Sequence, residues 1–127
     1  MKVTSKLQYE FTKNVISLGN FAIELVENGV YDRFVLGELW RQPEMQRILK
    51  ERGDSKVLYG RHQDKLAIDI FFWQDGRFIS NVPKNKEKLQ DIGDFWESRH
   101  PNNAWGGNWY HKAGDWIDLP HFERSEF

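Results

Sequence analysis

The chain has 127 residues, 18 of them basic and 19 acidic, with a formal net charge of -1 at pH 7. This length is typical of one domain, so we expect a single domain over residues 1–127, and the evenly spread charge argues against nucleic acid as a partner. The chain contains no cysteine, which excludes disulfides and thiolate metal sites, so a stable metal site must use histidine and carboxylate ligands.

The first ten residues include Lys2, Lys6 and Glu10 and lack the apolar stretch of a signal peptide. No apolar stretch approaches the roughly 18 residues that a membrane helix needs. We therefore expect synthesis that ends in the cytoplasm and no stable membrane insertion. A substrate outside the cell would be reached only after lysis or by a separate export route.

The first half of the chain predicts a long helix, a strand and a shorter helix. Apolar residues recur every three or four positions from Leu7 to Val26, which is typical of one helical face, and Asn28-Gly29 should end this helix. The apolar segment 33–40 predicts a strand that leads to Arg41. Residues 43–52 then predict a helix, with Pro43 at its first position.

Residues 66–72 carry the clearest strand pattern, because apolar residues alternate along them. Asp69 shares a face of this strand with Ala67 and Phe71. The sequence Gln74-Asp75-Gly76-Arg77 predicts a hairpin turn, and residues 78–82 predict the returning strand.

The last part of the chain predicts a helix and a loop. Residues 83–99 contain helix formers and an apolar face, although Gly93 is unfavourable inside a helix. The segment from His100 is rich in Pro, Asn, Gly and Trp, which predicts a loop that runs into a short final strand at Trp116-Ile117.

Three residues have side chains suited to a metal ion: His62, Asp69 and His121. Two histidines and one carboxylate form a known type of catalytic zinc site, which leaves one position for water. His62 and Asp69 are seven positions apart, so they would lie on opposite faces of a regular strand. Both can bind one metal ion only if residues 60–65 form a loop or bulge. Alternatively, these residues are hydrogen-bonded structural side chains, and composition and spacing alone leave both interpretations open.

The segment from Gly60 to Asp69 resembles the S-x-H-x-x-G-x-A-x-D motif of the D-Ala-D-Ala carboxypeptidase and L-alanyl-D-glutamate endopeptidase family, the VanY-like zinc peptidases that include phage endolysins. The segment from Asp118 to Glu123 resembles the closing D-x-x-H-F-E element of the family. The resemblance implies that His62, Asp69 and His121 bind Zn²⁺ and that Asp118 is the general base.

Further site residues follow from looser similarities. The region around Arg41 resembles the segment whose arginine stabilises the oxyanion in the family, and the alternative for Arg41 is a surface ion pair. Trp105-Gly106-Gly107-Asn108-Trp109 resembles a W-G-G-x-W segment of phage members. Trp105 and Trp109 would then line the substrate site, and the alternative is a glycine turn flanked by packed indoles.

Two positions depart from the family motif: its Ser is Gly60 here and its Gly is Lys65. These departures leave the substrate open. Glu123 is expected to support the metal site without binding the metal. His100 and His111 match no motif and are interpreted as surface residues.

The resemblance implies an α+β fold of the hedgehog/D-Ala-D-Ala peptidase type, with helices on one face of a small antiparallel sheet and a zinc cleft on the other. We expect a monomeric zinc metallopeptidase that acts on peptidoglycan stem peptides. The first interpretation is a phage or prophage endolysin with L-alanyl-D-glutamate endopeptidase activity. It would reach the cell wall after a holin opens the membrane. The alternatives are a D-alanyl-D-alanine carboxypeptidase and a non-catalytic cell-wall-binding or virion module. The sequence leaves the scissile bond, the host and the native metal open.

Overall fold

The computed structural model describes residues 3–40, 42–53, 61, 64–109 and 117–125. Within these ranges the fold is α+β, and three α-helices accompany an antiparallel five-stranded sheet. The strands lie in the order β1 (Arg33–Leu36), β2 (Ala67–Gln74), β5 (His121–Arg124) and β4 (Asn103–Trp105), and β3 (Arg77–Phe78) pairs with β2. This confirms the predicted fold class. No helix in these ranges has the length and apolar character to cross a lipid bilayer.

The long first helix, α1 (Ser5–Glu27), is close to its predicted bounds. It begins at Thr4, whose hydroxyl accepts a hydrogen bond from the backbone N–H of Leu7, and this satisfies one of the free donors at a helix start. Phe11, Leu18 and Ala22 are buried, so the predicted apolar face is the one that packs against the rest of the protein.

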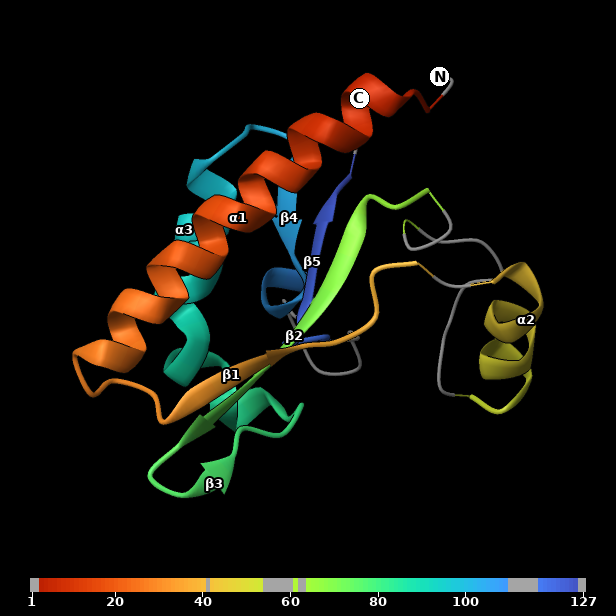
Figure 1. Cartoon of the computed structure of the whole chain (residues 1–127). Helices are drawn as coiled ribbons and strands as arrows, with labels where there is room; N and C mark the ends of the chain where they lie inside the picture. The colour runs from red at the N-terminus through yellow and green to blue at the C-terminus, as the bar shows by residue number, and fades with distance from the viewer. Residues whose placement is uncertain (1–2, 41, 54–60, 62–63, 110–116, 126–127) are drawn as a thin grey trace.

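Figure 1 shows α1 and α3 (Gln90–Ser98) packed together on one side of the sheet, whereas α2 (Pro43–Glu51) stands apart from them. The stacked rings of Phe21 and Phe95, with centroids 4.3 Å apart, join α1 to α3. Trp96 of α3 is fully buried and lies edge-on to both Phe11 and Phe122. The core therefore lies between these two helices and one face of the sheet.

The central strand is β2 (Ala67–Gln74), flanked by β1 (Arg33–Leu36) and β5 (His121–Arg124). Ile68, Ile70 and Phe72 are buried toward the core. The predicted hairpin turn is present: Asp75 and Gly76 both have positive φ, 54° and 76°, and the chain returns as β3 (Arg77–Phe78). β3 is shorter than the predicted strand 78–82.

Two predictions about the second half were wrong in part. Residues 83–99 form a 3-10 segment (Pro83–Leu89) followed by α3, and not one helix, because Leu89 is the one buried apolar side chain of the first part and offers no continuous face to the core. The segment after His100 includes β4 (Asn103–Trp105) and a 3-10 turn (Gly106–Trp109). The last strand in the described residues is β5. Of the predicted final strand, Ile117 lies in no strand and Trp116 lies outside the described residues.

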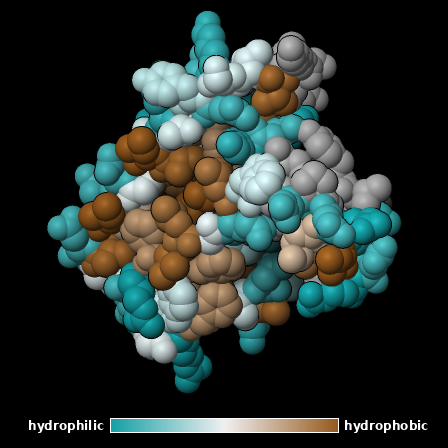
Figure 2. Space-filling model, turned by 45° about the vertical axis from the view of Figure 1, so that its right-hand side comes forward, coloured by the Kyte–Doolittle hydropathy of each residue, from teal (hydrophilic) through white to brown (hydrophobic). Residues whose placement is uncertain are grey.

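Large apolar side chains also remain exposed, and Figure 2 shows many of the brown residues gathered on one side of the visible face. Among the described residues, the exposed large apolar side chains are Tyr9, Ile16, Ile23, Val30, Val35, Leu36, Leu39, Trp40, Met45, Ile48 and Phe78.

Candidate metal and catalytic site

Asp69 and His121 lie opposite each other on neighbouring strands, because β2 and β5 pair in a register that places the two Cα atoms side by side. Oδ1 of Asp69 is 3.6 Å from Nδ1 of His121. Alternate residues of a strand point to opposite faces, so both side chains lie on the face opposite Ile68 and Phe122, away from the helical core. The pairing of the strands thus joins the two motifs identified in the sequence.

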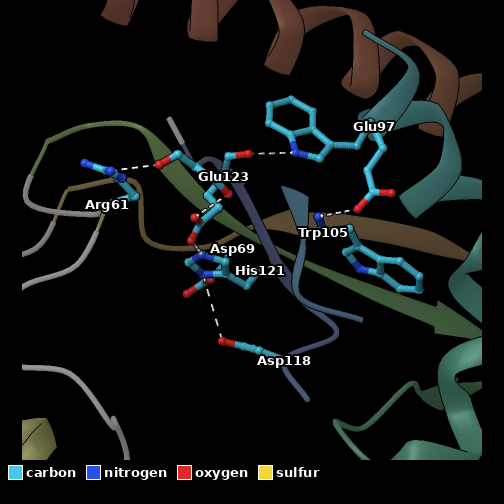
Figure 3. Close-up of polar contacts among 9 residues, drawn as sticks. Arg61, Asp69, Glu97, Trp105, Asp118, His121 and Glu123 are labelled. Carbon is cyan, nitrogen blue, oxygen red and sulfur yellow. Dashed lines mark hydrogen bonds and ion pairs between the residues drawn. The ribbon is translucent and has the colours of Figure 1, made fainter. Parts of the chain in front are cut away.

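Asp118 reaches the same place from a turn. The backbone N–H of His121 donates to the carbonyl of Asp118 (3.2 Å), and β5 begins directly after Pro120. This turn puts Oδ2 of Asp118 3.9 Å from Nδ1 of His121 (Figure 3). Asp118 is therefore close to the ring nitrogen that faces Asp69, without being in hydrogen-bond contact with it.

Glu123 lies on the other side of the same imidazole. Its Oε1 is 2.7 Å from Nε2 of His121, and its Oε2 accepts a hydrogen bond from the Ser125 hydroxyl (2.9 Å). The two ring nitrogens of His121 consequently have different surroundings: Nδ1 faces Asp69 and Asp118, and Nε2 faces Glu123 (Figure 3).

These surroundings set the charge of the ring. Burial of His121 disfavours its charged form, but the Asp69 and Glu123 carboxylates beside its ring nitrogens and the charge of Asp118 outweigh burial and raise its pKa to about 9. Burial likewise opposes the charge of Glu123, yet its contact with His121, the Ser125 hydroxyl and the charge of Arg61 bring its pKa below the usual value. The site is thus a largely buried concentration of negative charge that favours a cation.

The spacing of two donor atoms, one on Asp69 and one on His121, suits a zinc ion. Ligands about 2.0–2.2 Å from a tetrahedral ion are roughly 3.4 Å apart, close to the spacing between Asp69 and His121. A bound cation would take the place of the proton on Nδ1, while Glu123 would hold the proton on Nε2. Among the described residues no group of three His, Cys, Asp or Glu is arranged to hold a metal ion. His62, the predicted third ligand, lies outside them.

The segment before β2 forms a turn and not a regular strand. The carbonyl of Arg61 accepts hydrogen bonds from the backbone N–H groups of both Asp64 (3.1 Å) and Leu66 (2.9 Å). Lys65 has a φ of 58°, in the left-handed region that favours glycine. Lys65 occupies the glycine position of the family motif, and its backbone has a conformation that a glycine adopts without strain.

The two tryptophans of the W-G-G-x-W segment have different positions. Trp105 is fully buried, and its indole N–H donates to the carbonyl of Leu119 (2.8 Å), so it packs in the core and does not line a substrate site. Trp109 is half-buried, and its ring centroid is 5.0 Å from that of His121. The interpretation as a packed indole therefore holds for Trp105, whereas Trp109 lies beside the candidate site.

The glycine pair approaches the protein's own atoms. A Cβ on Gly106 would lie 2.1 Å from the carbonyl oxygen of Asp118, and a Cβ on Gly107 would lie 2.3 Å from the Trp105 ring. Gly37 is similarly restricted: its N–H donates to the Asp69 carbonyl (2.7 Å), and a Cβ there would lie 2.5 Å from the Phe71 ring. Sequence reasoning missed the part that Gly37 and Gly106 play in bringing the chain close to Asp69 and Asp118.

Two other residues singled out in the sequence, Arg41 and His111, lie outside the described residues. His100 accepts a hydrogen bond at Nδ1 from the backbone N–H of Asn102 (3.0 Å), a local contact in the turn after α3.

A solved structure has the same fold. The crystal structure of the L-Ala D-Glu endopeptidase ChiX from Serratia marcescens matches 72% of this chain, with a TM-score of 0.52 and 25% sequence identity. The match confirms the resemblance to the VanY-like zinc peptidase family. The chain spans 65% of the length of that protein. No family model matches the sequence, and no curated protein does.

Proposed function

We propose that this protein is a zinc-dependent peptidase that hydrolyses peptidoglycan stem peptides, with L-alanyl-D-glutamate endopeptidase activity. The observation that carries the proposal is the convergence of Asp69, Asp118 and His121 at one place on the sheet. These are three of the positions to which the family motifs assign a metal ligand or the general base. The fold is that of an L-Ala D-Glu endopeptidase.

Each residue of the site has a distinct role in this mechanism. Asp69 and His121 would hold the zinc ion together with His62. Zinc, when bound, would polarise the scissile carbonyl and lower the pKa of a water molecule. Asp118 would accept the proton of that water and return it to the leaving amine. Arg41 would stabilise the negative charge on the carbonyl oxygen in the transition state.

The face that bears Asp69 also offers apolar surface for a peptide. Val35 pairs with Phe71 across β1 and β2, two residues along the strand from Asp69. Val35 is exposed and Phe71 is half-buried. Trp109 lies beside His121, on the β5 side of β2. Together these side chains would contact the stem peptide while polar groups orient it.

The biological setting belongs to the same proposal. We infer a monomeric phage or prophage endolysin that is kept in the cytoplasm and reaches the cell wall after a holin opens the membrane.

Digestion of purified peptidoglycan tests the proposal. The zinc-loaded protein and its His121→Ala variant are compared by mass spectrometry and end-group analysis of the released fragments. New amino termini on D-Glu in the wild-type digest alone support the endopeptidase, and released D-Ala would indicate a carboxypeptidase instead. If the folded, zinc-loaded wild type releases nothing from several wall types, the proposal is wrong and the alternative of a non-catalytic binding module is favoured.

A further inference from the structure

A continuous set of hydrogen bonds connects His121 to the turn that precedes β2. From Nε2 of His121 it passes through Glu123 to the Ser125 hydroxyl, with contacts of 2.7 Å and 2.9 Å. The backbone carbonyl of Ser125 then accepts a hydrogen bond from Nη2 of Arg61, at 2.7 Å. Arg61, within the first motif, is thereby in direct contact with Ser125, two residues beyond the second motif.

Arg61 is fixed on both sides of its guanidinium. Nη1 donates to Oδ2 of Asp64 at 3.0 Å, while Nη2 contacts Ser125. Asp64 is buried, and its carbonyl accepts a hydrogen bond from Gln8 of α1 (2.9 Å). The planar guanidinium can make these two bonds at once because its donors diverge in a fixed geometry, which a lysine lacks.

The backbone of Ser125 is equally constrained. Its N–H donates to the carbonyl of Asn102 (2.8 Å), and the N–H of the preceding Arg124 donates to the carbonyl of Leu66 (2.9 Å). The buried Arg124 side chain donates to Asn103 and Asn14, both at 2.7 Å. Ser125 is thus a fixed point, and its hydroxyl holds Glu123 against His121.

We propose that Arg61 and Ser125 are positioning residues for the metal site: together they fix Glu123 on Nε2 of His121 and join Arg61, before β2, to the end of β5. The inference rests on the proposed function insofar as it concerns zinc. Neither residue touches the reacting atoms, and both act through Glu123 and the backbone. Nothing in the two sequence motifs assigns a role to either side chain.

The physical reason is orientation. A histidine ligand binds a metal well when its other nitrogen is held by an acceptor, and loss of such a partner commonly weakens metal affinity about 10- to 100-fold. Ser125 contacts Glu123 and acts on His121 only through it. Removal of the Ser125 hydroxyl should therefore weaken zinc affinity by roughly three- to tenfold. Removal of the Arg61 side chain should have a larger effect, because it releases the turn and Ser125 together.

The test measures zinc affinity in the full chain by competition with a chromophoric chelator, for wild type, Ser125→Ala, Ser125→Thr and Arg61→Ala. Ser125→Thr retains the hydroxyl and should bind zinc like wild type, whereas Ser125→Ala and Arg61→Ala should bind more weakly. Arg47→Ala is the matched control, because Arg47 makes an exposed ion pair of the same i,i+3 spacing with Glu44 at 3.2 Å. It should leave zinc affinity unchanged.

A second readout is the ¹⁵N-resolved Nε2–H signal of His121 in the zinc-loaded protein. Ser125→Ala should speed its exchange with water while the amide spectrum stays that of a folded protein. Folded Ser125→Ala with wild-type zinc affinity and wild-type exchange would overturn the inference, even if Arg61→Ala fails to fold. A wild type that binds zinc through His121 but cleaves no peptidoglycan would instead reject the proposed function and leave this inference standing.

Discussion

Asp118 is the residue on which the proposed chemistry depends most. Its carboxylate is near His121 but outside hydrogen-bond distance of it, as expected of a base that must face a water molecule. Asp118→Asn should reduce turnover by about 10²- to 10⁴-fold, a typical contribution of general base catalysis, while zinc binding and fold persist. Peptidoglycan digestion together with zinc titration checks this.

Asp94→Asn is the control for that substitution. Asp94 is exposed on α3 and accepts a hydrogen bond from Gln90, so its amide variant should digest peptidoglycan like wild type. Undiminished hydrolysis by Asp118→Asn would show that another group accepts the proton.

Lys65 offers a prediction about stability. Its φ of 58° is unfavourable for a residue with a Cβ, and its side chain is exposed. Lys65→Gly should raise the free energy of unfolding by about 0.5–1 kcal/mol, because relief of the left-handed strain exceeds the added freedom of the unfolded chain. Thermal denaturation measures the change. Lys65→Ala keeps the strain and should bring no gain, so an equal gain from alanine would trace the effect to the lysine side chain.

The close approach of Gly106 to Asp118 links the glycine turn, Gly106–Trp109, to the turn that carries Asp118. The N–H of Asp118 donates to the Gly106 carbonyl (3.1 Å), and a Cβ on Gly106 would collide with backbone atoms that cannot rotate away. Gly106→Ala should therefore lower stability by about 1–3 kcal/mol, as overpacking does, and reduce peptidase activity through displacement of Asp118.

Gly19→Ala is the matched control. A Cβ on Gly19 of α1 meets nothing within 4 Å, so this variant should gain up to about 1 kcal/mol from helix propensity. Urea denaturation compares the two variants, and equal stabilities would contradict the assigned contact.

The elements show which features a sequence can predict. The helix of residues 5–27, the strand of residues 67–74 and the Asp75-Gly76 turn follow from local periodicity and turn chemistry, which depend on neighbouring residues. The position of β5 was missed because His121–Arg124 is too short to carry a pattern of its own, and it is a strand through pairing with β2 and β4.

The candidate site divides in the same way. Asp69, Asp118 and His121 were predicted through the resemblance to the family motifs, because composition and spacing alone left their role open. The burial of Trp105 was not predictable, because it depends on the space that Gly93 leaves for the indole: a Cβ there would lie 2.0 Å from the ring. The contact from Arg61 to Ser125 joins residues 64 positions apart, and no local sequence pattern around either residue predicts it.

For the whole molecule, alkaline pH should reveal the burial of Tyr31. Its hydroxyl donates to the carbonyl of Lys88, and burial together with the charge of Asp91 raises its pKa to about 12. A folded-state pKa above the ordinary 10 means that the stabilisation is complete below pH 10 and is lost as the pH rises toward 12. The loss should reach about 2 kcal/mol, which denaturation at pH 8, 10 and 11.5 would measure.

Tyr31→Phe separates this effect from general alkaline denaturation. It should cost about 1 kcal/mol at pH 8 through the lost hydrogen bond, and it should flatten the decline above pH 10. Tyr9→Phe, at an exposed position of α1, should decline like wild type. An unchanged slope in Tyr31→Phe would assign the pH dependence to other groups.

Zinc should stabilise the molecule as a whole. A ligand that binds the folded state adds about 2.7 kcal/mol when its free concentration is 100 times its Kd. The melting temperature of wild type should therefore rise with zinc and fall again with a chelator, and His121→Ala should show neither change. A similar rise in His121→Ala would place the bound zinc elsewhere.

The pairing of Asp69 with His121 has a consequence for the order of events during synthesis. β2 and β5 are separated along the chain by β3, α3 and β4, so the two halves of the candidate site meet only after this whole intervening segment has been synthesised. A nascent chain that stops before β5 would lack His121 and Glu123 altogether. Such a chain would therefore lack the metal site of the proposed peptidase, and an interrupted translation product would not cleave a cell wall.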